Sequence, residues 1–181
     1  ITFNMDEYVG LAPEAPQRFA RYLDEHIFSK VNFGKVNYLA GDDGKLNPVY
    51  SDMFTHNRAD ICFMGIGENG HIAFNDPPVA DLFDDNFAKE VKLDDVCRMQ
   101  QVHDGCFASF DLVPEKAITL TVPTLLRTSK LICAVPGSTK AKAAYDMLNG
   151  PIGVECPASS LRLHPDATLY LDADAAALLK V

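Results

Sequence analysis

The sequence has few positive charges, no paired-cysteine motif and no long hydrophobic run, and each shortage excludes a class of protein. Lys and Arg together number 16 against 25 Asp and Glu, which gives a formal net charge of −9. An acidic chain without a basic patch is unsuited to nucleic acid, so none is expected as a partner. No apolar run approaches the roughly 18 residues of a membrane span, so no membrane partner is expected.

The five cysteines are odd in number and form no CxxC motif. Cys62 and Cys133 lie in apolar runs typical of strands, where cysteine packs as a small hydrophobic residue. This usage favours a reduced, cytoplasmic location. The first ten residues have no basic stretch and no cleavage-site pattern, which argues against a signal peptide. They resemble the end of a strand, so we expect residues 1–181 to form one domain that lacks its N-terminal part.

Short apolar runs alternate with segments of helical spacing along the chain. The expected strands are 36–40, 60–65, 117–122, 130–136 and 167–171. The expected helices are 13–30, 139–150, 157–164 and 173–180. Ser138 is expected to cap one helix and Gly150 to end it. Continuous apolar strands separated by helices predict an α/β fold with a mostly parallel sheet covered by helices on both faces.

Ligands in such folds bind beyond the carboxyl ends of the strands. That rule selects three loops as candidate sites, at residues 4–7, 65–76 and 137–140. The middle loop belongs to the stretch MGIGENGHIAFNDPP, residues 64–78, which contains a GxGxxG spelling. A dinucleotide turn must open a long helix, and the two prolines at the end of this stretch prevent one. The glycines therefore predict a turn that lets the backbone approach a ligand, with a purely structural turn as the alternative.

His71 is the residue of this loop best suited to chemistry. The unperturbed pKa of histidine is about 6.5, so its imidazole can accept and donate protons near neutral pH. A hydrogen bond from Asn69 could orient the ring, and Asp76 could stabilise its charged form or carry the proton itself. Two structural alternatives stay open, namely a histidine with purely structural partners and an aspartate that only starts the turn before proline.

The other two loops supply a carboxylate and a cation. Asp6 and Glu7 follow the opening apolar residues, and Asp6 would act as a base if it pointed into a cleft near His71. The alternative is a solvated loop or a helix cap. Lys140 beside Ser138 and free backbone N–H groups predicts an anion site, against the alternative of an exposed helix lysine. No metal-ligand spacing is present, so no metal is expected.

Four segments taken together resemble one known family. They are FNMDEYVGL at 3–11, GIGENGHIAFNDPP at 65–78, PGSTKA at 136–141 and CPASSLRLHPDATLYLD at 156–172. The combination resembles the glucosamine-6-phosphate deaminases, which belong to a wider group that includes the 6-phosphogluconolactonases, and it covers essentially the whole chain. The resemblance implies a modified Rossmann-like fold and conversion of an aminosugar phosphate to fructose 6-phosphate and ammonia. It implies a small sugar phosphate as partner and no metal or organic cofactor, because the steps are proton transfers.

The resemblance also implies roles for individual residues. Asp6 matches the base that moves a proton from C2 to C1, and His71 matches the group that opens the sugar ring. Asn69 and Asp76 match the partners of that histidine, although the family usually has glutamate at the second position. Lys140 matches a phosphate-contacting lysine. The further substrate contacts expected are Glu7, Gly67, Gly70, Ser138 and Arg98.

The sequence also departs from the family pattern. The family has a strand and a Gly/Ser/Thr-rich phosphate loop ahead of the NMDEY motif, and residues 41–59 are shorter here. Within 79–103 the only arginine is Arg98, and His103 lies near the position of a family arginine. Two alternatives stay open: a 6-phosphogluconolactonase-like hydrolase, which needs no C2 base, and a sugar-phosphate-sensing module, which needs neither catalytic group. A homo-oligomer is left open as well.

Overall fold

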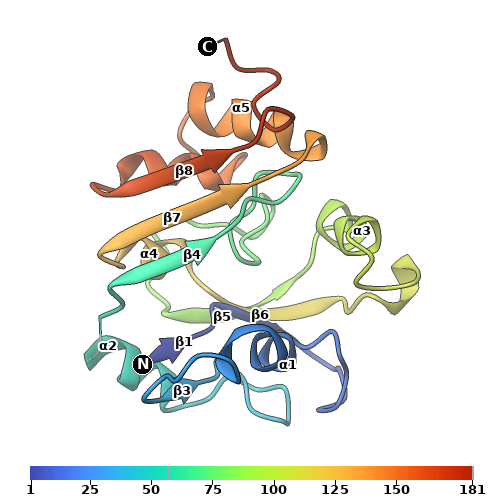
Figure 1. The fold of residues 1–181 in the computed structure, drawn as a ribbon, viewed down its shortest axis with the longest axis vertical. Helices are drawn as coiled ribbons and strands as arrows, with labels where there is room; N and C mark the ends of the chain where they lie inside the picture. Colours follow the sequence, from blue (N-terminus) through green and yellow to red (C-terminus); the bar gives the residue numbers. More distant parts are fainter. Residues whose placement is uncertain (57, 181) are drawn as a thin grey trace.

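The computed structural model describes residues 1–56 and 58–180, and a parallel three-stranded sheet lies at its centre (Figure 1). The order of its strands is β4 (Ile61–Met64), β7 (Lys130–Val135) and β8 (Ala167–Leu171), and both pairings are parallel. All three carboxyl ends point toward the side of the molecule on which α3 (Asp95–His103) lies (Figure 1). The sequence predicted these three strands to within two residues, and the α/β fold class is confirmed.

A second sheet adjoins the first and is antiparallel, and of its strands the sequence predicted the one at 117–122. Its order is β2 (Asp6–Tyr8), β6 (Lys116–Leu120) and β5 (Ala88–Lys92). The sequence of β5, AKEVK, is mostly charged, and Val91 is its only buried residue. A search for continuous apolar runs therefore missed it. A further parallel pair joins β1 (Thr2–Phe3) to β3 (Val36–Asn37).

The helices are short. The α-helices besides α3 are α1 (Phe19–Leu23), α2 (Tyr50–His56), α4 (Val122–Leu126) and α5 (Ala141–Asn149). A π-helical turn η1 (Asp24–Phe28) continues α1, and the 3₁₀ turns are η2 (Phe110–Leu112), η3 (Ser138–Lys140) and η4 (Pro157–Leu163). No helix among the described residues is long and apolar enough to cross a membrane.

Three helix predictions need correction. The helix expected over 13–30 forms only from residue 19 to 28. The helix expected over 173–180 is a series of turns. Ser138 makes no capping hydrogen bond and instead begins η3, behind Gly137 with its positive φ of 95°. Gly150 does end α5 as expected.

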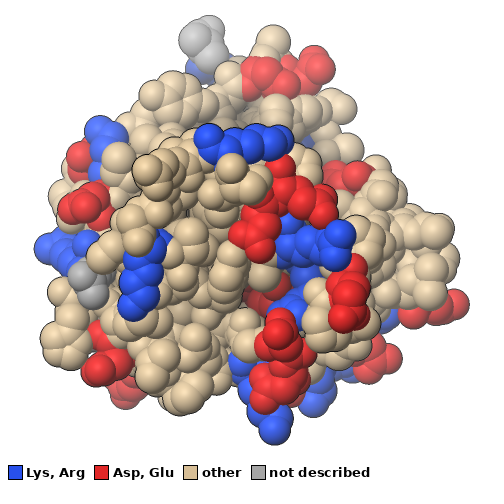
Figure 2. All heavy atoms as spheres, turned by 60° about the horizontal axis from the view of Figure 1, so that its bottom comes forward, with Lys and Arg blue, Asp and Glu red and all other residues tan. Residues whose placement is uncertain are grey.

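Buried apolar side chains form two clusters. The larger one surrounds the parallel sheet and includes Leu131 and Val135 of β7. The smaller one lies beneath α3 and contains Tyr8 of β2, Phe74 of the loop after β4, and Cys97 of α3. Through this second cluster, both α3 and the loop at 65–76 pack against β2. On the face in Figure 2, acidic side chains gather beside Lys and Arg on one side, and uncharged atoms cover most of the other.

Glu7 ties β2 to the start of α1. Its carboxylate accepts hydrogen bonds from the backbone N–H groups of Tyr8 (2.9 Å), Phe19 (3.0 Å) and Ala20 (2.9 Å). The Nε of Arg18 lies 3.8 Å from the same carboxylate. A negative charge here satisfies N–H groups that a helix start leaves unpaired. The expected substrate contact does not fit this position, because Glu7 is only 1% exposed and its oxygens are engaged by the backbone.

We expect Glu7→Gln to lower the free energy of unfolding by about 2 kcal/mol, because hydrogen bonds to a buried charged group are lost. Urea denaturation at neutral pH measures the change. Glu14→Gln is the matched control, since Glu14 is exposed, and it should stay within about 0.5 kcal/mol of the wild type. Equal stability of both variants would show that Glu7 is not a structural cap.

Candidate active site

The loop at 65–76 leaves the carboxyl end of β4 and folds back tightly around an imidazole. The N–H of Gly67 donates to the carbonyl of His71 (2.9 Å), and the N–H of Gly70 donates to the carbonyl of Gly67 (3.0 Å). A Cβ on Gly67 would lie 2.1 Å from Cε1 of His71, so the ring occupies space that only glycine leaves free. Gly70 has a φ of +84°, and a Cβ there would lie 2.7 Å from Sγ of Cys156. These glycines therefore shape the turn that holds His71.

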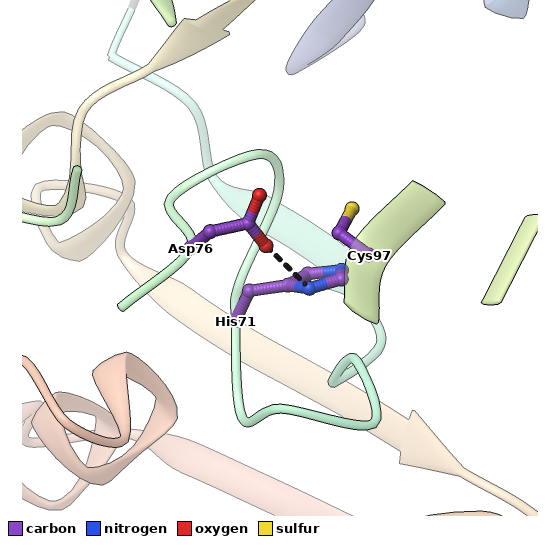
Figure 3. A group of neighbouring side chains, drawn as sticks. All are labelled: His71, Asp76 and Cys97. Carbon is purple, nitrogen blue, oxygen red and sulfur yellow. Dashed lines mark ion pairs between the residues drawn. The ribbon is translucent and has the colours of Figure 1, made fainter. Parts of the chain in front are cut away.

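The imidazole of His71 is oriented through one nitrogen. Its Nδ1 lies 2.7 Å from Oδ1 of Asn69 and 2.9 Å from Oδ1 of Asp76 (Figure 3). Both oxygens are acceptors, which assigns the proton of the neutral ring to Nδ1. The other nitrogen, Nε2, is then able to accept a proton from a ligand. The sequence predicted both partners, and the structure brings them together around His71.

Asp76 is fully buried and held as a carboxylate. Its Oδ1 accepts a hydrogen bond from Nδ2 of Asn69, and its Oδ2 accepts one from the backbone N–H of Asp94, each 3.1 Å long. Burial raises the pKa of Asp76, but the hydrogen bond and charge of His71, with the bonds from Asp94 and Asn69, hold it below its usual value. Asp76 therefore suits the stabilisation of a charged imidazole better than carrying the proton itself.

Residues at the start of α3 hold the loop at 65–76 by hydrogen bonds, and these contacts were not predicted from the sequence. Oδ2 of Asp94 accepts a hydrogen bond from Nδ2 of Asn69 (3.1 Å). Oε1 of Gln100 accepts one from the N–H of Glu68 (2.9 Å). The paired acids 94–95 ahead of a helix were a signal for a helix start. They were overlooked because the preceding strand, β5, was not recognised.

Asp6 approaches the same region from β2. It pairs with Thr119 of β6, whose Oγ1 accepts a hydrogen bond from the N–H of Phe74. Burial, and then the charge of Glu7, raises the pKa of Asp6 to about 7. Burial raises the pKa of the Cys97 thiol, and the charges of Asp76 and Asp6 raise it further. Asp6 thus lies within electrostatic reach of the group around His71.

A groove of about 1080 Å³ runs along β4. Its lining extends from Arg58 through the strand to Gly65, and Asp6 lines it as well. Most of its other lining residues are apolar. The groove therefore gives the carboxyl of Asp6 an apolar surrounding, which is consistent with its raised pKa.

Lys140 lies in η3, beyond the carboxyl end of β7. Burial lowers its pKa, while the charges of Asp104, Glu68 and Cys97 act in the opposite direction. Its ammonium makes no hydrogen bond or ion pair with the part of the chain that the structure describes. Lys140 can therefore contact an anion. The exposed Ser138 lies two residues before it in the same turn.

Unlike the ammonium of Lys140, the guanidinium of Arg98 is bound by other parts of the protein. Its Nη2 donates to the carbonyls of Phe110 (3.1 Å) and Val113 (2.8 Å), and its guanidinium lies 4.0 Å from the ring centroid of Phe110. The side chain is buried between α3 and η2. This position argues against the phosphate contact expected from the sequence, because the guanidinium is used to hold η2.

We expect Gly67→Ala to lower the free energy of unfolding by about 1–3 kcal/mol, the usual cost of overpacking, because the new methyl group displaces the imidazole. Chemical denaturation measures the loss. Gly34→Ala is the control, since a Cβ there meets nothing within 4 Å. That variant should change stability by less than about 0.5 kcal/mol. Similar values for the two variants would contradict the close contact between Gly67 and His71.

Comparison with known proteins places these features in a family. Residues 4–170 match the family described as glucosamine-6-phosphate isomerases/6-phosphogluconolactonase. A glucosamine-6-phosphate deaminase of Lactobacillus delbrueckii subsp. bulgaricus is 36% identical over 98% of this chain and 75% of its own length. A glucosamine-6-phosphate deaminase of Streptococcus thermophilus is 39% identical over 97% of this chain and 75% of its own length.

Solved structures give the same result. A monomeric glucosamine-6-phosphate deaminase superposes with a TM-score of 0.86 at 30% identity, over 98% of this chain and 74% of that chain. The 6-phosphogluconolactonase of Trypanosoma brucei shares the fold, with a TM-score of 0.72 at 15% identity over 98% of this chain and 73% of that chain. The chain belongs to the glucosamine-6-phosphate isomerase/6-phosphogluconolactonase family.

Proposed function

We propose that this protein is a glucosamine-6-phosphate deaminase, which converts glucosamine 6-phosphate to fructose 6-phosphate and ammonia. The observation that carries the proposal is a pair of proton-transfer groups linked through Thr119 of β6, which pairs with Asp6 and accepts a hydrogen bond from Phe74 in the loop of His71. One is the carboxyl of Asp6 with a pKa of about 7, and the other is the imidazole of His71 with Nδ1 held by two oxygens. The similarity to proteins named glucosamine-6-phosphate deaminases supports the proposal.

His71 performs the first step in this proposal, the opening of the sugar ring. Its Nε2 takes the proton of the C1 hydroxyl and returns it to the ring oxygen, which breaks the C1–O5 bond and leaves an aldehyde. The imidazole is positively charged between the two transfers. The carboxylate of Asp76, 2.9 Å from Nδ1, stabilises that charge.

Asp6 performs the second step. Its carboxylate removes the proton from C2, which gives an enolamine, and the resulting carboxylic acid returns the proton to C1. A proton passes from the amine to the C1 oxygen, so that C1 becomes a primary alcohol and C2 an imine. Water then adds to C2, and ammonia leaves. A carboxyl with a pKa of about 7 suits both directions, because it accepts and releases a proton with similar ease near neutral pH.

The loop at 137–140 binds the substrate phosphate in this proposal. Lys140 supplies the positive charge, and Ser138 supplies a hydroxyl donor from the same turn. We further propose a cytoplasmic location, which is supported by the five free cysteines.

The test of the proposed function is the release of ammonia from glucosamine 6-phosphate, with ketose phosphate followed in parallel. Equal amounts of the two products support the proposal. Hydrolysis of 6-phosphogluconolactone without ammonia release would favour the lactonase alternative. Tight binding of sugar phosphate without turnover would favour a sensor.

We expect Asp6→Asn to abolish exchange of the C2 proton with solvent, because an amide cannot accept it. Binding of the sugar phosphate should change little, since Asn has the same shape. Proton exchange is followed by NMR in deuterated buffer. Asp60→Asn is the control, because Asp60 lines the same groove, and it should exchange at the wild-type rate. Retained exchange in Asp6→Asn would remove Asp6 from the role of base.

The raised pKa of Asp6 also sets a pH dependence. The carboxylate form is the base, so kcat/KM of the wild type should fall roughly tenfold per pH unit below pH about 7 and level off above it. A plateau that extended down to the ordinary pKa of aspartate would contradict the raised value.

We expect Lys140→Ala to raise KM for glucosamine 6-phosphate roughly 10- to 100-fold with a smaller effect on kcat, because a charged contact to a non-reacting group is lost. Steady-state kinetics measure both constants. Lys142→Ala is the matched control, since Lys142 is exposed and pairs with Asp146. Unchanged KM for Lys140→Ala would exclude a phosphate contact.

A further inference from the structure

We propose that His71, Asp76 and Cys97 form a binding site for Zn²⁺, and that a bound ion inhibits the enzyme by occupying the imidazole. The binding of zinc stands on the geometry alone. Its inhibitory effect rests on the function proposed above.

Three donors from two elements meet at this point. His71 and Asp76 come from the loop after β4 and Cys97 comes from α3, as Figure 3 shows. A nitrogen, a carboxylate oxygen and the sulfur of these residues all lie within 4.8 Å of one another. No sequence motif indicates this group, because its cysteine lies on a different element from the other two donors.

The donor set fits zinc rather than a harder cation. Imidazole, carboxylate and thiolate are the ligands that Zn²⁺ takes in proteins, whereas Mg²⁺ and Ca²⁺ prefer oxygen alone. With zinc–ligand bonds of about 2.0–2.3 Å in a tetrahedral arrangement, the donors must lie about 3.3–3.7 Å apart. The group is therefore within about 1 Å of the required spacing. The Nδ1 of His71 and Oδ1 of Asp76, now 2.9 Å apart, would separate slightly to admit an ion.

The charges balance on binding. The thiol of Cys97 releases its proton to solvent, and the thiolate with the carboxylate of Asp76 neutralises the two positive charges of zinc. The imidazole binds as the neutral ring through Nδ1, and the proton that Nδ1 carries in the metal-free protein moves to Nε2. A water molecule can complete the four ligands. The side chain of His71 is 10% exposed, which gives solvent ions a path to an otherwise buried group.

Cobalt spectroscopy tests the binding without any need for turnover. Protein freed of metal by a chelator is titrated with Co²⁺, and the wild type should develop a thiolate-to-cobalt charge-transfer band that one equivalent of Zn²⁺ removes. Cys97→Ser should lose the band and bind zinc at least about tenfold more weakly. Cys106→Ser is the matched control, since Cys106 is exposed. This variant should keep the charge-transfer band and the zinc affinity of the wild type. No band in the wild type, or an unchanged band in Cys97→Ser, overturns the proposal.

A second measurement covers the case in which Cys97→Ser does not fold. Zinc X-ray absorption of the wild type should show one sulfur ligand with nitrogen and oxygen ligands. A shell of nitrogen and oxygen alone overturns the proposal.

Activity measurements separate this proposal from the proposed function. Zinc should inhibit ammonia release by the wild type and Cys106→Ser reversibly, and at least about tenfold more weakly in Cys97→Ser relative to its own metal-free rate. A cobalt band that depends on Cys97, without ammonia release, would support the zinc site and refute the deaminase. Ammonia release from a protein that shows no band would support the deaminase and refute the zinc site.

Discussion

The buried carboxylate of Asp76 is the constraint on which the candidate site depends. A charge with no exposure to solvent must be compensated by hydrogen bonds or by an opposite charge. Asp76 finds these partners in His71, Asn69 and the backbone N–H of Asp94. The same bonds fix the turn after β4 against the start of α3. The orientation of the imidazole is thus determined by the need to satisfy one buried charge.

The structure gives its two central carboxyl groups opposite environments. Asp76 has hydrogen-bond donors around it, and its pKa is lowered. Asp6 lines an apolar groove and has Glu7 as its neighbour, and its pKa is raised to about 7. Because the two pKa values are shifted in opposite directions, the two carboxyl groups suit different chemical roles. These shifts favour a charged Asp76 that can stabilise a cation, as proposed above, and an Asp6 that can exchange a proton.

Much of this arrangement was predictable from the sequence. The parallel strands were visible as apolar runs, and the rule on their carboxyl ends selected the segments that contain Asp6, His71 and Lys140, although Asp6 lies in the antiparallel strand β2 and not in a loop. Tertiary contacts decided the rest. The family resemblance predicts a substrate ligand at Glu7, but its carboxylate accepts hydrogen bonds from three backbone N–H groups of α1 and its own strand. The family resemblance predicts a phosphate ligand at Arg98, but its guanidinium donates hydrogen bonds to the carbonyls of Phe110 in η2 and of Val113 after it. No sequence motif indicates the hydrogen-bond partners of Glu7 or of Arg98.

The proposed function requires Asp6 of β2, the loop at 65–76 and the turn at 137–140 to act on one ligand. A crystal structure with an open-chain analogue of glucosamine 6-phosphate tests this most directly. We expect the phosphate to contact Lys140 and Ser138, C2 to lie beside the carboxyl of Asp6, and C1 to lie beside Nε2 of His71. An analogue bound with its phosphate away from Lys140, or with C2 out of reach of Asp6, would contradict it.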